Sequence, residues 1–175
     1  MISIKKPLLF LTAVSLFLGT AFTGCEKDKK DVDKPITFSE KRHTLSREVA
    51  DKIMEAFINN DEEDLYSLLS EETKDFPRVR EQIREAFEIF EGEIIFYTPP
   101  ERAGLASSYI SSDIREIRTN SGDVYALSFS AYFIYDDSIM EFNGVGSIVI
   151  DHVDISSDIY GDFYKRIGIG VKIQD

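Results

Sequence analysis

The chain has 175 residues and a formal net charge of −12, from 32 acidic and 20 basic side chains, and it contains one cysteine. An acidic surface disfavours nucleic acid, which binds through Lys and Arg at its phosphates, and it also disfavours electrostatic docking on anionic lipid. We therefore expect no nucleic-acid partner. A single cysteine also rules out a disulfide within the chain.

The N-terminal segment predicts export. Residues 1–24 carry Lys5 and Lys6 but no acid, continue with an apolar run from Pro7 to Ala21, and end in Thr-Gly. This arrangement is typical of a signal peptide. The apolar run is shorter than the roughly 20 residues that a spanning helix needs. Removing the signal takes away two positive charges, so the mature part would carry about −14.

The cysteine directly follows this predicted signal. Thr23, Gly24 and Cys25 resemble the lipobox of bacterial lipoproteins, in which the cysteine receives a diacylglycerol and becomes the first residue; Phe22 stands where the motif usually has an aliphatic residue. The resemblance implies a lipid bilayer as partner, through acylated Cys25, because two acyl chains give stable anchoring. It also implies a location at the cell membrane or the outer envelope leaflet, facing away from the cytoplasm. The alternatives are ordinary cleavage that leaves a thiol, or an uncleaved anchor.

Residues 25–42 are predicted to be a lipidated flexible tether. Acids and lysines alternate from Glu26 to Lys34 with little apolar content, and such a segment cannot form a core. A flexible chain of this length spans roughly 20–25 Å, which would hold the domain off the headgroups. The remainder, residues 43–175, is long enough for one domain with its own core.

The first part of this domain, residues 43–91, predicts two to three helices. Apolar residues recur at helical spacing in a first stripe, an Asn-Asn-Asp break follows, and Asp61 can cap a short second helix. A third apolar stripe, residues 79–90, follows Pro77 and ends before Gly92. The first stripe consists of Leu45, Val49, Ile53 and Phe57.

The second part predicts strands that are separated by turns. Helices first and strands last indicate an α+β domain, with the N-terminal helices packed on a curved antiparallel sheet of about four to five strands. The turns at Asn120–Asp123 and at Asp136–Ser138 are short enough for a meander. The predicted strands span residues 94–97, 109–118, 124–135, 139–152 and 164–173.

Three stretches carry a resemblance to a known family. They are Ala56–Asp61 with the leucines that follow, Phe90–Ile94 where the third helix meets the sheet, and Tyr125–Phe129 with Asn143–Ile148 on the next strand. Together they resemble a family of bacterial lipoproteins of unknown function with an NTF2-like (cystatin-like fold) domain. The resemblance covers about residues 45–152. It implies a cone-shaped domain, and it implies no chemistry.

One face of the strand 124–135 is rich in aromatic residues. Because side chains alternate along a strand, this face packs against the helices, and in a cone fold part of it can open into a pocket. His152, on the same face of the next strand, is either a strand-end histidine or an acid–base group. The opposite face, with Ser128, Ser130 and Tyr132, could serve as a dimer or partner surface. The pocket candidates are Tyr125, Phe129, Phe133, Phe142, Ile148 and His152.

The sequence lacks the usual catalytic constellations. It has no His-x-x-x-His or Cys-x-x-Cys pattern and no Gly-rich phosphate loop, and the acids at 61–64 suit a helix start better than a cation. We therefore expect no metal, no cofactor and no catalytic residue. The favoured function is a non-catalytic binding module for an envelope protein, a peptide or a small apolar ligand. The alternatives are an assembly domain that forms a homodimer through its sheet, and a pocket enzyme that uses His152 or a buried carboxylate as acid or base.

Overall fold

The computed structural model describes residues 37–105, 108–136, 139–153 and 163–171. The described residues all belong to one compact unit. The predicted signal peptide, Cys25 and most of the predicted tether lie outside the described residues. None of the helices in the described part of the chain is long and apolar enough to cross a membrane.

Four helices come first along the domain. The first begins earlier than predicted, because Thr37 and Glu40 form a capping box: the Thr37 hydroxyl accepts from the Glu40 N–H at 3.2 Å, and the Glu40 carboxylate accepts from the Thr37 N–H at 2.7 Å. Residues 38–42, predicted as tether, are therefore helical. The helices are α1 (Phe38–Asn59), α2 (Glu62–Leu68), α3 (Glu71–Lys74) and α4 (Val79–Phe87).

Arg42 lies in the segment that was predicted to be solvated, yet its side chain is buried. Its guanidinium carbon lies 4.7 Å from the ring centre of Phe38 and 5.0 Å from that of Phe133. A cation over an aromatic face is attracted by the ring quadrupole. These contacts attach the first turns of α1 to β4 (Val124–Asp136).

The strands of the described residues belong to one antiparallel sheet of order β1-β3-β4-β5-β6, with β2 also paired to β3. The prediction of an α+β fold with an antiparallel sheet is confirmed, and the described ranges hold four helices and six strands in place of two to three helices and four to five strands. The strands are β1 (Ile94–Tyr97), β2 (Glu101–Leu105), β3 (Tyr109–Thr119), β4, β5 (Ile139–Val153) and β6 (Phe163–Ile169). β1 and β2 pair with opposite ends of β3.

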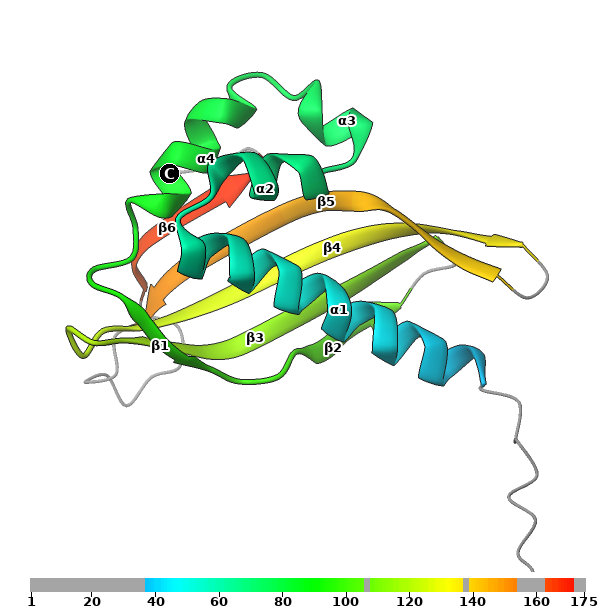
Figure 1. Ribbon diagram of the computed structural model, residues 1–175, viewed down its shortest axis with the longest axis horizontal. Coiled ribbons are helices and arrows are strands. Elements are labelled where there is room, and N and C mark those ends of the chain that lie inside the picture. The colour runs from blue at the N-terminus through cyan, green and yellow to red at the C-terminus, as the bar shows by residue number, and fades with distance from the viewer. Residues whose placement is uncertain (1–36, 106–107, 137–138, 154–162, 172–175) are drawn as a thin grey trace, which may run out of the picture. The chain divides into compact units, whose positions relative to one another are not determined.

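The helices gather on one face of the sheet, where α1 lies against β3, α3 against β5 and α4 against β6 (Figure 1). The first predicted helical stripe faces this layer: Val49, Ile53 and Phe57 are buried and Leu45 packs beside them. From the sheet side the layer is filled by large fully buried side chains, namely Ile114, Ile117, Tyr125, Leu127, Ile148 and Ile150.

The junction between α2 and α3 rests directly on the backbone of β5. The Ser70 N–H donates to the Val145 carbonyl at 2.9 Å, and the Thr73 hydroxyl donates to the Gly146 carbonyl at 3.0 Å. Gly144 makes this approach possible: its φ is +105°, and a Cβ added to it would lie 2.5 Å from the Ser70 Cα. Gly144 thus allows the α2–α3 junction to lie directly on β5.

Candidate functional site

The six pocket candidates occupy adjacent strands as three cross-strand pairs. Tyr125 is opposite His152, Phe129 is opposite Ile148, and Phe133 is opposite Phe142. Four of the six side chains are buried, while Phe142 and His152 are half-buried.

The space above these residues is occupied by side chains from the helices. Ile53, Met54 and Leu65 are completely buried there. Two depressions open on the surface of the described residues, and of the six candidates only Phe133 lines one of them. The aromatic face of the sheet is therefore a packed layer.

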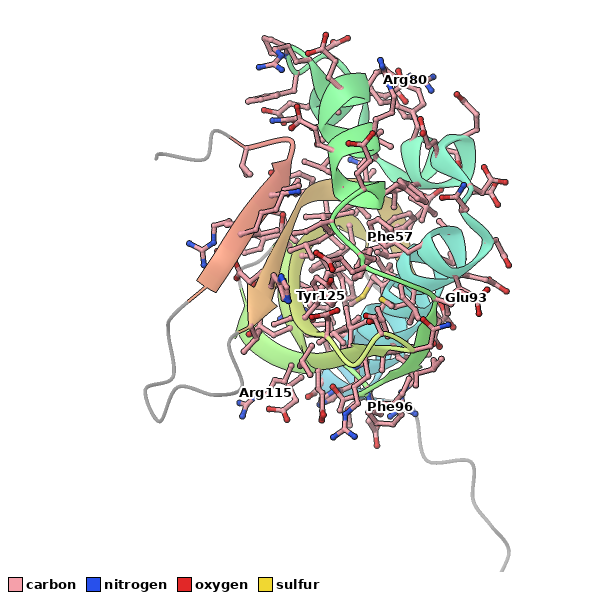
Figure 2. All side chains as sticks on the ribbon, turned by 90° about the vertical axis from the view of Figure 1, so that its left-hand side faces the viewer. Phe57, Arg80, Glu93, Phe96, Arg115 and Tyr125 are labelled. Atoms are coloured by element: carbon pink, nitrogen blue, oxygen red, sulfur yellow. The ribbon has the colours of Figure 1, made fainter. Side chains whose placement is uncertain are left out.

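A chain of ring contacts runs through this layer, from the ends of α1 and α4 to the sheet. Phe57 contacts Phe87 and Phe90 with ring centres 4.8 Å and 5.2 Å apart. Tyr125 continues the chain at 4.9 Å from Phe90 and 4.6 Å from His152. Figure 2 shows Phe57 and Tyr125 between the helices and the sheet. Each such pair contributes about 0.5–1.5 kcal/mol beyond the area it buries.

The hydroxyl of Tyr125 is bonded as well as buried. It accepts a hydrogen bond from the Glu91 N–H at 2.9 Å. Burial raises the pKa of Tyr125. The ring stays neutral at ordinary pH and holds the loop after α4 to the sheet.

At the far end of the ring chain, His152 meets the turn between β3 and β4. Its Nε2 lies 3.3 Å from Asp123 Oδ1, and the Ser121 hydroxyl lies 2.6 Å from Asp123 Oδ2. The hydrogen bond from Ser121, followed by the one from His152, lowers the pKa of Asp123. With His152 stacked on Tyr125 at an interplanar angle of 24°, this cluster fastens the turn to β5.

Replacing Asp123 with asparagine is expected to reduce the acid sensitivity of folding. The pKa of this carboxyl is depressed below its ordinary value of 3.8. Its stabilising contribution is therefore present above that value and is lost as pH falls through the folded-state pKa. The difference in urea midpoint between wild type and Asp123→Asn should thus shrink between pH 6 and pH 3. Ser121→Ala removes the hydrogen bond that lowers the Asp123 pKa most, so the difference in urea midpoint between wild type and this variant should also shrink from pH 6 to pH 3. A difference that does not change with pH would contradict this assignment.

Of the acids at positions 61–64, Asp61 caps α2 as predicted, while Glu63 forms an ion pair with Arg80. The Asp61 carboxylate accepts from the Asp64 N–H at 2.9 Å and caps the helix. Within the described ranges, no three His, Cys, Asp or Glu side chains are placed to hold a metal ion.

A surface depression of about 410 Å³ opens where α1, α4 and β1 meet, and we name it the β1 groove. Its floor is aromatic: Phe57 is buried, and Phe87 and Phe90 are half-buried. Its rim is polar. Sequence reasoning assigned these rings to the core and missed the groove. The lining residues are Phe57, Ile58, Asn60, Phe87, Phe90, Gly92, Glu93 and Ile94.

Large apolar side chains continue from the groove along the sheet edge. Ile58 is exposed at the rim, and Ile95 and Phe96 are exposed on β1, Ile95 at 65%. β1 is an edge strand with an irregularity between Ile94 and Phe96, and an edge strand presents backbone donors and acceptors along its outer side. Figure 2 shows Phe96 at the outer margin of the domain.

Acidic residues accompany this edge. Glu93 lines the groove, and the Tyr97 hydroxyl on β1 donates to Asp51 Oδ1 at 3.1 Å. Burial raises the pKa of Tyr97, and the negative charges of Asp51 and Glu55 raise it further. The groove thus combines an aromatic floor, an adjoining edge strand and one acidic lining residue, Glu93, which suits an apolar ligand or an extended segment.

The sequence matches no protein-family model, and a search of curated proteins finds no similar chain. The fold defines an α+β domain in which four helices cover one face of an open antiparallel sheet.

Proposed function

We propose that this protein is a cell-envelope lipoprotein, anchored by acylated Cys25, whose folded part is a non-catalytic NTF2-like binding module. The support for the anchor is sequence: a charged start, an apolar run and the lipobox-like Thr23-Gly24-Cys25. The support for the NTF2-like part is the order of four helices before a sheet, with the helices on one face.

The packed layer between helices and sheet favours a binding module over a pocket enzyme. A pocket enzyme needs a cavity with convergent polar groups, whereas Tyr125, Phe129 and Ile148 are buried among apolar side chains. Binding then takes place on the surface. The β1 groove is the best candidate, because its aromatic floor is open to a protein segment or a small apolar ligand.

A photo-reactive amino acid placed at Ile58 or Ile95 tests this proposal in cells. Both positions are exposed at the groove and its edge, so each should give a discrete adduct that mass spectrometry can assign. Arg115 is the control, since it is exposed on β3 and Figure 2 shows it pointing away from Phe57. Equal labelling from Arg115, or no adduct at either groove position, would contradict binding at the groove. An adduct at twice the chain's mass would favour the homodimer alternative.

A further inference from the structure

A second apolar surface lies at the opposite end of α1 from the β1 groove, and we name it the tether-end patch. It consists of Phe38, Tyr109, Ile134 and Tyr135, all exposed. The rings of Phe38 and Tyr135 are in edge contact with centres 4.6 Å apart. Tyr109 begins β3 and pairs with β4 through Tyr132. By strand alternation, Tyr109 and Ile134 lie on one side of the sheet and Tyr135, with Phe38 against it, lies on the other, so the patch is made of two apolar sets around one end of the sheet.

The shape of this patch is unusual for a protein-binding face. Ile134 and Tyr135 are successive residues on β4, so their side chains point to opposite sides of the strand. Both are exposed, and the second surface depression adjoins Ile134. The apolar surface therefore wraps around this end of the β4–β5 hairpin. A fluid interface can contact both sides of such an edge, whereas a rigid partner would cover one side.

The chain enters the domain at this patch. α1 begins at Phe38, and only residues 26–37 separate it from Cys25. A segment of this length reaches at most about 40 Å, whatever its conformation. The β1 groove lies at the other end of α1, whose 22 residues cover about 33 Å at 1.5 Å per residue. An anchor at Cys25 therefore keeps the patch, more than the groove, close to the lipid.

We propose that the tether-end patch docks at the headgroup-level interface of the bilayer that holds the anchor, an inference that rests on the lipid anchoring proposed above. Tyrosine and phenylalanine suit this layer, because their rings are apolar and the tyrosine hydroxyl stays hydrated. The docking uses aromatic side chains. Because Glu71 and Glu72 line the adjoining depression and would be repelled by anionic headgroups, we expect docking on zwitterionic lipid. The docked domain presents the β1 groove away from the membrane.

Single tryptophans measure this docking, because the chain has none of its own. Tyr135→Trp reports on the patch and Phe96→Trp is the matched control, since the two native side chains are 46% and 47% exposed. The lipidated full-length chain is placed in phosphatidylcholine vesicles with brominated acyl chains. Interfacial apolar groups reach about 5–10 Å into the boundary, so emission from Tyr135→Trp should shift to the blue and be quenched. Phe96→Trp should keep its emission.

Each other outcome overturns the docking. If the chain floats with the vesicles but the two variants have equal emission, docking by the patch is rejected and the anchor is retained. A chain that does not float with the vesicles counts against the anchor. The same variants are then held on chelating lipid by a histidine tag in place of Cys25, and their emission tests docking of the patch separately. A concentration-dependent blue shift of Tyr135→Trp without vesicles assigns the patch to a second copy of the chain.

Discussion

Replacing Cys25 with serine is expected to abolish acylation and, because cleavage follows acylation in the lipobox route, to leave residues 1–24 on the chain. In the proposed lipoprotein this sulfur carries the diacylglyceryl group. Each buried methylene contributes about 0.8 kcal/mol, and two acyl chains give stable anchoring where one gives only reversible binding. The variant should take up no labelled fatty acid and should migrate as the longer, unprocessed chain, as measured by metabolic labelling and immunoblotting.

Phe22→Leu is the matched control for this experiment. It keeps the thiol of Cys25 and restores the aliphatic residue that the lipobox usually has at this position, so the variant should be labelled and processed. Cys25→Ser that is labelled and processed like wild type would contradict acylation at Cys25. A wild-type chain that is itself unlabelled and unprocessed would favour the uncleaved apolar segment, residues 7–21, as the anchor.

Replacing Gly144 with alanine is expected to cost about 3 kcal/mol or more of unfolding free energy, from backbone strain and overpacking together. The new methyl group would meet the Ser70 backbone, at 2.5 Å from its Cα and 2.6 Å from its N. Because backbone cannot move aside as a flexible side chain can, the α2–α3 junction must shift away from β5. A loss of this size is a large fraction of the total stability of a small domain.

Gly122→Ala separates the two contributions to that cost. Gly122 has almost the same backbone angle, with φ +101° against +105°, yet a Cβ there would meet no atom within 4 Å. It should therefore lose only the strain, about 1–2 kcal/mol. Urea unfolding of both variants measures the difference. Equal losses would show that the close approach of Ser70 to β5 contributes nothing.

The main strands could be predicted because local signals and tertiary structure agree there. β1 begins and ends where predicted, and β3, β4 and β5 extend only one residue beyond their predicted ends. Turn residues and alternating apolar side chains mark these strands. The buried face of β4 follows the alternation, and that of β3 follows it as far as Ile114, where an irregularity places Ile117 on the buried face. The packing of the first helical stripe was predictable for the same reason.

The other elements depend on contacts that no local pattern shows. β2 has few apolar side chains and exists through its pairing with β3. α3 is one turn long. The start of α1 was placed five residues too late, because Arg42 looks like a tether residue, whereas its guanidinium is buried against Phe38 and Phe133.

For the aromatic candidates, the sequence predicted the side of the strand on which they lie, but it did not predict whether they line a pocket. Alternation placed Tyr125, Phe129 and Phe133 on the helix-facing side of β4, as the structure does. Periodicity cannot tell whether the space beyond such a face is hollow or filled. The β1 groove requires three segments to meet at Phe57, Phe90 and Ile94, which sequence spacing alone does not reveal.

The most direct test of the account is the mass of the mature N-terminal peptide from the membrane-purified protein. Trypsin should release Cys25-Glu26-Lys27. The account predicts that Cys25 is the first residue and that its sulfur carries a diacylglyceryl group. An unmodified Cys25 thiol, or a mature chain that begins at any other residue, would contradict it.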